Sequence, residues 1–119
     1  MKKMLENKQI GIDIVDVERF RKKAIEENKS FYNKIFTDLE IRYCQKFSDP
    51  YPHFAGKFAL KEAVQKSIQE NIVFKKIETY HTNSKPEIKI ENQERKYVFI
   101  ASISHEKKYA IAIAISKKN

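Results

Sequence analysis

The chain has 119 residues, with 24 Lys and Arg against 16 Asp and Glu, and its formal net charge is +8. A hydrophobic content of 41% with 12% aromatic residues supplies a core and excludes a disordered polycation, and this length accommodates one domain. The single cysteine excludes a disulfide scaffold and no apolar run approaches the ~20 residues of a membrane-spanning helix, so we expect one cytoplasmic domain over residues 1–119 with no membrane partner.

The first predicted element is a strand over residues 9–15, where apolar side chains alternate with others. Three isoleucines, at positions 10, 12 and 14, share the face that we expect to be buried. Gly11 and Asp13 share the opposite face, and a glycine in a strand often marks the close approach of a ligand or a backbone. The residues alone leave Asp13 open between a solvent-facing side chain and a functional one.

Helices are predicted next, over residues 16–27 and 31–36. The sequence Thr37-Asp38-Leu39-Glu40 has the spacing of a capping box and predicts a helix from 37 to about 47. A proline-containing break follows, and the principal helix is predicted over 52–69.

One row of the principal helix carries Phe54, Phe58 and Glu62 at intervals of four residues, with Lys66 next. A carboxylate at the end of an apolar row must be exposed, neutralised or bound to a cation. From the residues alone an exposed ion pair between Glu62 and Lys66 is the favoured interpretation, and a bound cation is the alternative.

The second half of the chain predicts strands over 73–81, 87–90, 97–104 and 109–116, the last two joined as a hairpin. A strand, then helices, then consecutive strands indicate an α+β fold in which an antiparallel sheet packs against a long helix and shorter helices. Glycine-rich dinucleotide and phosphate loops, paired zinc ligands and a hydrolase nucleophile elbow are all missing from the sequence.

Four segments, taken in order, resemble the motifs of one enzyme family. They are Gly11–Phe20 (GIDIVDVERF), Phe36–Glu40 (FTDLE), Phe54–Lys66 (FAGKFALKEAVQK) and Ile103–Ala110 (ISHEKKYA). In this order and spacing they resemble the holo-acyl carrier protein synthases, the small type of 4'-phosphopantetheinyl transferase, and the resemblance extends over essentially the whole chain.

The resemblance implies transfer of the 4'-phosphopantetheine group from coenzyme A to a serine of apo-acyl carrier protein, with release of 3',5'-ADP, in fatty acid biosynthesis. It implies Asp13 and Glu62 as ligands of Mg²⁺, with Mn²⁺ as an alternative ion; Mg²⁺ typically binds one or two carboxylates together with substrate phosphates. Glu62 and Lys66 are the implied catalytic residues. Lys66 would reach the pyrophosphate, and either Glu62 or a metal-bound water would take the proton of the serine hydroxyl.

The same resemblance implies the substrate contacts. Coenzyme A is expected to contact Lys57, Lys66, Pro86, Ser104 and His105. The acidic carrier protein is expected to dock on the first helix, where Arg19 occupies the family's arginine position and charge adds Arg21, Lys22 and Lys23. The family also implies a homotrimer with active sites between neighbouring subunits.

Two turns depart from the family pattern because glycines are missing. Ser67–Ile72 stands in place of a Gly-Thr-Gly turn, and Ser84 precedes Lys85 and Pro86 where the family has glycine. Asparagine tolerates positive φ better than most residues, so we expect Asn71 and Asn83 to take left-handed conformations here.

A small basic nucleic-acid-binding domain is the alternative, because the chain combines a charge of +8 with six tyrosines. Such a domain needs aromatic and basic side chains interleaved on one sheet face. Tyr97 and Phe99 fit this pattern, whereas Ala101 and Ile103 do not. Two anionic substrates, a nucleotide and an acidic carrier, explain the charge instead, and we expect no nucleic-acid partner.

Overall fold

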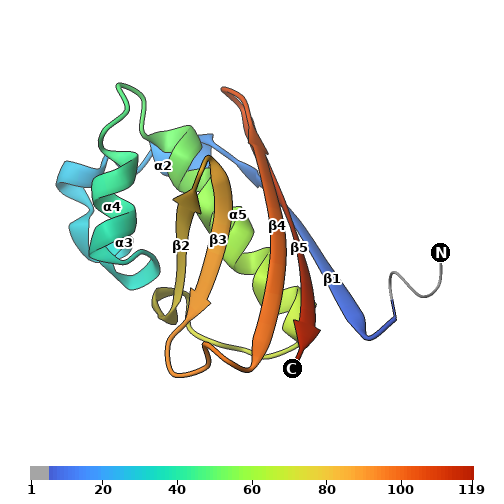
Figure 1. The fold of residues 1–119 in the computed structure, drawn as a ribbon. Helices are drawn as coiled ribbons and strands as arrows, with labels where there is room; N and C mark the ends of the chain where they lie inside the picture. The colour runs from blue at the N-terminus through green and yellow to red at the C-terminus, as the bar shows by residue number, and fades with distance from the viewer. Residues whose placement is uncertain (1–5) are drawn as a thin grey trace.

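One long helix, α5 (Tyr51–Ile68), organises the computed structural model, which describes residues 6–119 (Figure 1). The other elements surround it, and in chain order they are β1 (Lys8–Asp16), α2 (Glu18–Arg21), a 3₁₀ turn (Ile25–Glu27), α3 (Lys29–Ile35), α4 (Asp38–Cys44), a second 3₁₀ turn (Phe74–Lys76), β2 (Ile77–Thr82), β3 (Lys85–Ile90), β4 (Tyr97–His105) and β5 (Tyr109–Lys118). The three short helices gather near the N-terminal end of α5, away from the C-terminal end of β5 (Figure 1).

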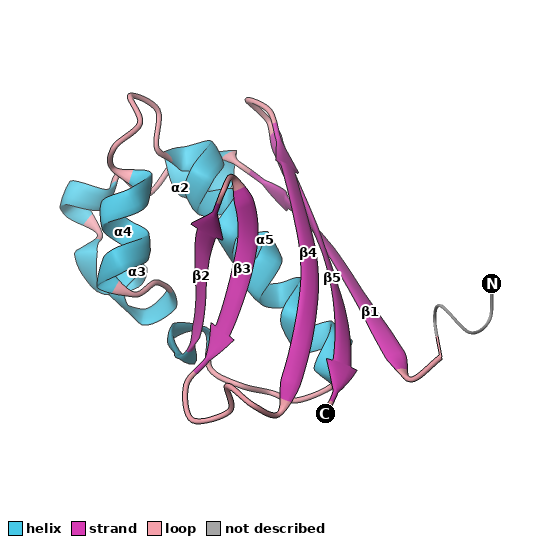
Figure 2. Cartoon of the chain, in the orientation of Figure 1, coloured by secondary structure: helices cyan, strands magenta, loops and turns pink. Residues whose placement is uncertain are grey.

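The strands form two antiparallel sheets (Figure 2). Strands β1, β5 and β4 pair in that order, and β2 and β3 form a separate hairpin. The α+β prediction is therefore confirmed, with the predicted strands divided between two sheets. No helix within residues 6–119 is both long and apolar enough to cross a lipid bilayer.

The predicted buried face of β1 is wrong. Ile10, Ile12 and Ile14 are 52%, 54% and 63% exposed, whereas Gly11 and Val15 on the other face are buried against the rest of the fold. An added Cβ on Gly11 would lie 1.9 Å from the carbonyl oxygen of Ala63 in α5, so β1 and α5 approach backbone to backbone at this glycine. Alternation along a strand establishes that two faces exist, but this close approach decides which of them is inside.

The isoleucine face of β1 continues across the sheet. The exposed aliphatic side chains on this side of β1, β5 and β4, which we name the aliphatic face, are Ile10, Ile12, Ile14, Val98, Ile100 and Ile111. On the opposite side Tyr97 and Phe99 pack against the core, so the interleaved aromatic platform that a nucleic-acid-binding domain needs does not form on the open surface of β4.

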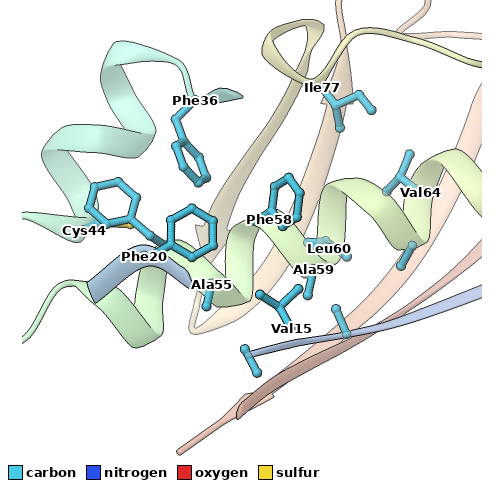
Figure 3. Close-up of a cluster of buried hydrophobic side chains, with 14 of the residues drawn as sticks. Val15, Phe20, Phe36, Cys44, Ala55, Phe58, Ala59, Leu60, Val64 and Ile77 are labelled. Carbon is cyan, nitrogen blue, oxygen red and sulfur yellow. The ribbon is translucent and has the colours of Figure 1, made fainter. Parts of the chain in front are cut away.

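Helix α5 is buried around most of its circumference, as expected for a helix that is covered on several sides. Its Ala55 and Ala59 lie on the side of β1 and Val15, and Phe58 lies on the side of the short helices (Figure 3). The aromatic cluster there has ring centroids 5.6 Å apart for Phe20 and Phe58. Small residues toward the sheet and aromatic residues toward the helices therefore fix α5 between the two layers.

The single helix predicted over 16–27 is instead broken into α2 and a 3₁₀ turn, with Ala24 in an extended conformation between them. The buried hydroxyl of Tyr32 donates to the carbonyl oxygens of Phe20 at 3.1 Å and Lys23 at 2.8 Å. These are carbonyls that a continuous helix would pair with its own backbone. The tertiary contact with Tyr32 therefore replaces the helix that local propensity favours.

The predicted capping box of α4 is confirmed, because Thr37 Oγ1 accepts from the Glu40 N–H at 3.3 Å and Glu40 Oε1 accepts from the Thr37 N–H at 2.8 Å. Glu40 also forms a fully buried ion pair, 2.6 Å long, with Lys61 of α5. The second oxygen of Glu40 accepts from the backbone N–H of Thr79 at 2.8 Å and from its hydroxyl at 2.6 Å. One satisfied buried carboxylate thus ties α4, α5 and β2 together.

The missing glycines are replaced by residues with positive φ. Asn83 has a φ of 50° as predicted, and Ser84 follows with 67°. The prediction for Asn71 is wrong, because the left-handed residue after α5 is its C-cap, Gln69, with a φ of 56°. A helix commonly ends on a left-handed residue immediately after its last turn, and here that position falls two residues before Asn71.

Restoring glycine at these positions is expected to stabilise the fold. Gln69→Gly and Ser84→Gly should each raise the free energy of unfolding by about 0.5–1 kcal/mol, because left-handed strain is relieved and part of the gain is offset by unfolded-chain entropy. Chemical denaturation measures this change. Asn71→Gly is the control, since it relieves no positive φ and should be neutral or destabilising; an equal gain from it would contradict the prediction.

Candidate functional site

Asp13 on β1 and Lys66 on α5 come together although they are far apart in the sequence. Lys66 Nζ lies 3.1 Å from Asp13 Oδ1 and donates to the carbonyl oxygen of Ile12 at 3.0 Å. The side chain of Asp13 is only 14% exposed, so it faces α5 rather than solvent. Among the ion pairs of residues 6–119, Lys66 pairs with Asp13 and not with Glu62, which leaves the helical ion-pair interpretation of Glu62 without support.

The half-buried carboxylate of Glu62 is in the field of Asp13. Burial raises the pKa of Glu62, the negative charge of Asp13 raises it further, and Lys66 and Arg19 lower it. A carboxylate whose ionisation is opposed by the charge of a second carboxylate forms with it a site that favours an additional cation.

This coupling can be measured directly. Asp13→Asn is expected to lower the pKa of Glu62 toward its ordinary range, because the neighbouring negative charge is removed, whereas Lys66→Met is expected to raise it. A carbon-detected NMR titration of the Glu62 carboxylate in metal-free protein reads both changes. A pKa that stays the same in Asp13→Asn would place the two carboxylates too far apart to act together.

The donor set at this point fits a hard divalent cation. No group of three or more His, Cys, Asp or Glu side chains within residues 6–119 is close enough to hold a metal ion by itself. Mg²⁺ does not need such a cage, since it commonly takes one or two carboxylates and completes its shell with phosphates and waters. Asp13 and Glu62 supply oxygen ligands of this kind.

The basic residues predicted for carrier docking differ in what they contact. The guanidinium of Arg19 lies 5.1 Å from the ring centroid of Phe58 and acts on Glu62, so Arg19 borders the carboxylate site. Arg21 is engaged with Asp49 at 2.8 Å. Lys22 and Lys23, which follow α2, are exposed, and the ammonium of Lys23 lies 4.9 Å from the ring centroid of Phe31.

The predicted coenzyme A residues divide into two groups. Lys57 and His105 line one pocket of about 120 Å³, together with Tyr43, His53, Gly56, His81 and Ile103. Pro86 of β3 pairs with His81 of β2 and so lies next to this pocket. Ser104 is exposed and points to the opposite side of β4, because side chains alternate along a strand and its neighbours Ile103 and His105 line the pocket.

The ammonium of Lys57 is held inside the protein. Its side chain is 2% exposed, and Nζ donates to the carbonyl oxygen of Thr79 at 2.9 Å and to the Thr79 hydroxyl at 3.0 Å. Burial lowers the pKa of Lys57, and the nearby Glu40 opposes this shift. Because Thr79 is itself bound to Glu40, the buried network of α4 positions Lys57 at the pocket.

Sequence reasoning missed two residues of this pocket, His53 and His81. Burial lowers the pKa of His53 and the adjacent His105 lowers it further; burial also lowers the pKa of His81, with Lys57 adding to the effect. His53, His81 and His105 are all the histidines of the chain and lie more than twenty residues apart in the sequence. No local motif therefore connects them, and their small number is the only signal that the sequence offers.

Other features carry less chemistry. A larger hollow of about 470 Å³ between α3 and α4 includes none of the predicted site residues. Cys44 of α4 is fully buried, and burial raises the pKa of its thiol to about 12, which makes it unreactive at neutral pH.

Comparisons with known proteins place these residues in a family context. Residues 9–114 match the model of the 4'-phosphopantetheinyl transferase superfamily. The chain is 43% identical over 109 residues to a holo-[acyl-carrier-protein] synthase of Thermodesulfovibrio yellowstonii, which covers 89% of this chain and 95% of that protein.

Solved structures give the same family. The holo-[acyl-carrier-protein] synthase of Helicobacter pylori in complex with coenzyme A has a TM-score of 0.79 at 31% identity, over 91% of this chain and 99% of that one. The synthase of Bacillus anthracis, in complex with CoA (3',5'-ADP), has a TM-score of 0.79 at 26% identity, over 93% of this chain and 96% of that one.

Proposed function

The chain belongs to the holo-[acyl-carrier-protein] synthase family of the 4'-phosphopantetheinyl transferase superfamily, and we propose that it transfers the 4'-phosphopantetheine group of coenzyme A to a serine of an apo-acyl carrier protein, releasing 3',5'-ADP. The observation that carries this proposal is the meeting of Asp13, Glu62 and Lys66 between β1 and α5. We propose one catalytic domain over residues 1–119, of which the family match covers residues 9–114, and we propose that it works in the cytoplasm in fatty acid biosynthesis.

Asp13 and Glu62 are the residues that would hold Mg²⁺, or Mn²⁺ in its place. When bound, such an ion polarises the phosphate under attack and neutralises charge on the departing 3',5'-ADP. Lys66 is 55% exposed and contributes a mobile positive charge to the pyrophosphate. The proton of the serine hydroxyl goes either to the Glu62 carboxylate or to a water at the same site.

Lys57, His105 and Pro86 would contact the nucleotide part of coenzyme A. Gly56, beside this pocket, and Glu62 lie six residues apart on α5, which corresponds to about 9 Å along the helix axis. Phosphate groups of one extended nucleotide can occupy both places. Two solved relatives are complexes with coenzyme A or 3',5'-ADP, which supports a nucleotide of this kind as the ligand.

The aliphatic face supports the proposal of a homotrimer. Six large apolar side chains exposed on one side of a sheet are unusual for a surface that faces only water. Ser104 is exposed on the same side of β4, so its coenzyme A contact would be made to a molecule bound at a neighbouring subunit. The carrier would dock on α2 through Arg19, Lys22 and Lys23, with Arg21 available once it leaves Asp49.

Intact-mass analysis of an apo-acyl carrier protein tests the proposal. Incubation with this protein, coenzyme A and Mg²⁺ is expected to add one phosphopantetheine group to the carrier and to release 3',5'-ADP. Omission of the metal with a chelator present should stop the reaction, and a carrier whose acceptor serine is replaced by alanine should remain unmodified. No mass adduct on any apo-carrier would refute the proposed function.

A further inference from the structure

All three histidines of the chain line the pocket that also receives Lys57. The rings of His53 and His105 are 4.7 Å apart between centroids. His53 also stacks on Phe47 at 3.6 Å, and His81 stacks on Tyr43 at 4.8 Å. The lining thus combines one lysine with three imidazoles drawn from α5, β2 and β4, and no carboxylate is among its residues.

Lys57 supplies the evidence that this pocket holds an anion. Its ammonium has three N–H donors, of which two are used on Thr79, and it lies 4.7 Å from the ring centroid of Tyr43 in the same pocket. Among residues 6–119 no carboxylate forms an ion pair with it, although it is 2% exposed. The pocket of about 120 Å³ is well above the ~10–15 Å³ that a single water needs, so a group of several atoms fits beside this charge.

We propose that this pocket is a proton-linked phosphate site, in which His53 and His81 take up protons from solvent as a phosphate group of the nucleotide binds. The inference rests on the proposed function for the source of that phosphate, which is coenzyme A or 3',5'-ADP. The role assigned to His53 and His81 is proton uptake on phosphate binding. As a consequence, the affinity for the nucleotide increases as the pH falls.

The charges around each imidazole explain the linkage. His53 of α5 faces Tyr43 of α4, His105 of β4, His81 of β2, Lys57 of its own helix and Asp49 of the preceding loop. His81 faces Tyr43 and Lys57. Asp49 favours the protonated form of His53, but its charge is shared with Arg21.

Lys57 and the neighbouring imidazoles oppose protonation while the pocket is empty. The carboxylates that act on Lys57 are Glu40, which is paired with Lys61, and Glu78, which accepts from the Thr37 hydroxyl. Neither of them is among the charges that act on His53 or His81. A phosphate carries up to two negative charges and reverses the sign of the local field. The electron-rich faces of Phe47 and Tyr43 then stabilise the imidazolium rings stacked on them.

Calorimetric titration with 3',5'-ADP, in buffers of different ionisation enthalpy, counts the protons taken up. The phosphate itself titrates with a second pKa of about 6 and releases its proton on binding as a dianion, so the informative quantity is the difference between the wild type and a variant. Relative to the His53→Gln/His81→Gln double variant, the wild type should take up about one additional proton near pH 7. As the pH rises from about 6 to about 8, the affinity of the wild type for 3',5'-ADP should fall more steeply than that of the double variant, by up to ~10-fold more per pH unit.

Two controls make the result specific. Lys34→Gln removes a positive charge from the exposed side of α3 and should leave proton uptake unchanged. Inorganic phosphate should reproduce the difference between the wild type and the double variant at higher concentration, whereas adenosine should not. If the double variant loses its fold, the exposed His81→Gln single variant and an NMR titration of the histidine ring protons replace it, with the His53 pKa expected to rise when 3',5'-ADP is added.

Equal proton uptake by the wild type and the double variant would overturn the inference. This failure can be told apart from a failure of the proposed function. Phosphopantetheine transfer with no histidine-dependent proton uptake refutes only the inference. Proton-linked binding of 3',5'-ADP without any transfer to a carrier refutes only the proposed function.

Discussion

Replacing Asp13 by Ala or Glu62 by Gln is expected to abolish phosphopantetheine transfer and to leave the fold intact. Each change removes one of the two carboxylates that meet between β1 and α5, and with it the charge that would hold a divalent cation beside Lys66. An ion in this position contributes several kcal/mol of transition-state stabilisation, so the initial rate should fall by about 10²–10⁴-fold or more. Intact-mass kinetics on the carrier measure the rate, and thermal unfolding monitors the fold.

The matched control for these variants is Glu26→Gln, which removes an exposed carboxylate outside the site. Its rate should equal that of the wild type. Calorimetric binding of Mn²⁺ gives a second readout that does not depend on turnover, and both site variants should bind the ion more weakly. Near-normal transfer by either variant, with the fold retained, would contradict the assignment of that residue as a ligand.

Local sequence patterns predicted those elements whose signals are short-range. The capping box at Thr37 and the long helix α5 were both confirmed, because neighbouring side chains decide a helix start and a helical apolar row. The broken helix after β1 was not predicted, since the hydroxyl of Tyr32 that replaces its backbone hydrogen bonds lies nine residues beyond Lys23. Tertiary contacts of this kind override local propensity.

The two halves of the candidate site were predictable to different degrees. Asp13 and Glu62 are 49 positions apart in the sequence, so the family resemblance predicts that they meet, whereas no spacing rule does. His53 and His81 belong to none of the family motifs, and only the packing of α5 beside β2 brings them into one pocket. Clusters assembled by topology leave almost no trace in the linear sequence.

The inverted face of β1 has the same origin. Three isoleucines at alternating positions are typical of a buried strand face, but alternation alone does not say which of the two faces packs against the helix. Gly11 was the better indicator, because a strand glycine permits a backbone contact that no other residue allows.

Gly11→Ala should therefore be among the most destabilising single-methyl changes in the chain. The new Cβ would stand 1.9 Å from the Ala63 carbonyl oxygen and 2.8 Å from the Ser67 nitrogen, which are backbone atoms of α5 that no rotamer change can move away. The strand must separate from the helix, and the free energy of unfolding is expected to fall by about 3 kcal/mol or more. Displacement of β1 also carries Asp13 away from Glu62, so transfer activity should be lost with stability.

Gly56→Ala, in helix α5, supplies the comparison. Its Cβ would meet side-chain atoms only, the Ile103 Cγ2 at 3.0 Å and the His105 Cδ2 at 3.6 Å, and these can adjust by small rotations. Alanine also gains about 1 kcal/mol in helix propensity over glycine, which offsets the tighter contact and keeps the expected change within about 1 kcal/mol. Denaturant unfolding measures the loss of unfolding free energy in both variants. Similar losses would mean that β1 can move away from α5 at Gly11 at little cost, and that the backbone contact does not hold Asp13 at the site.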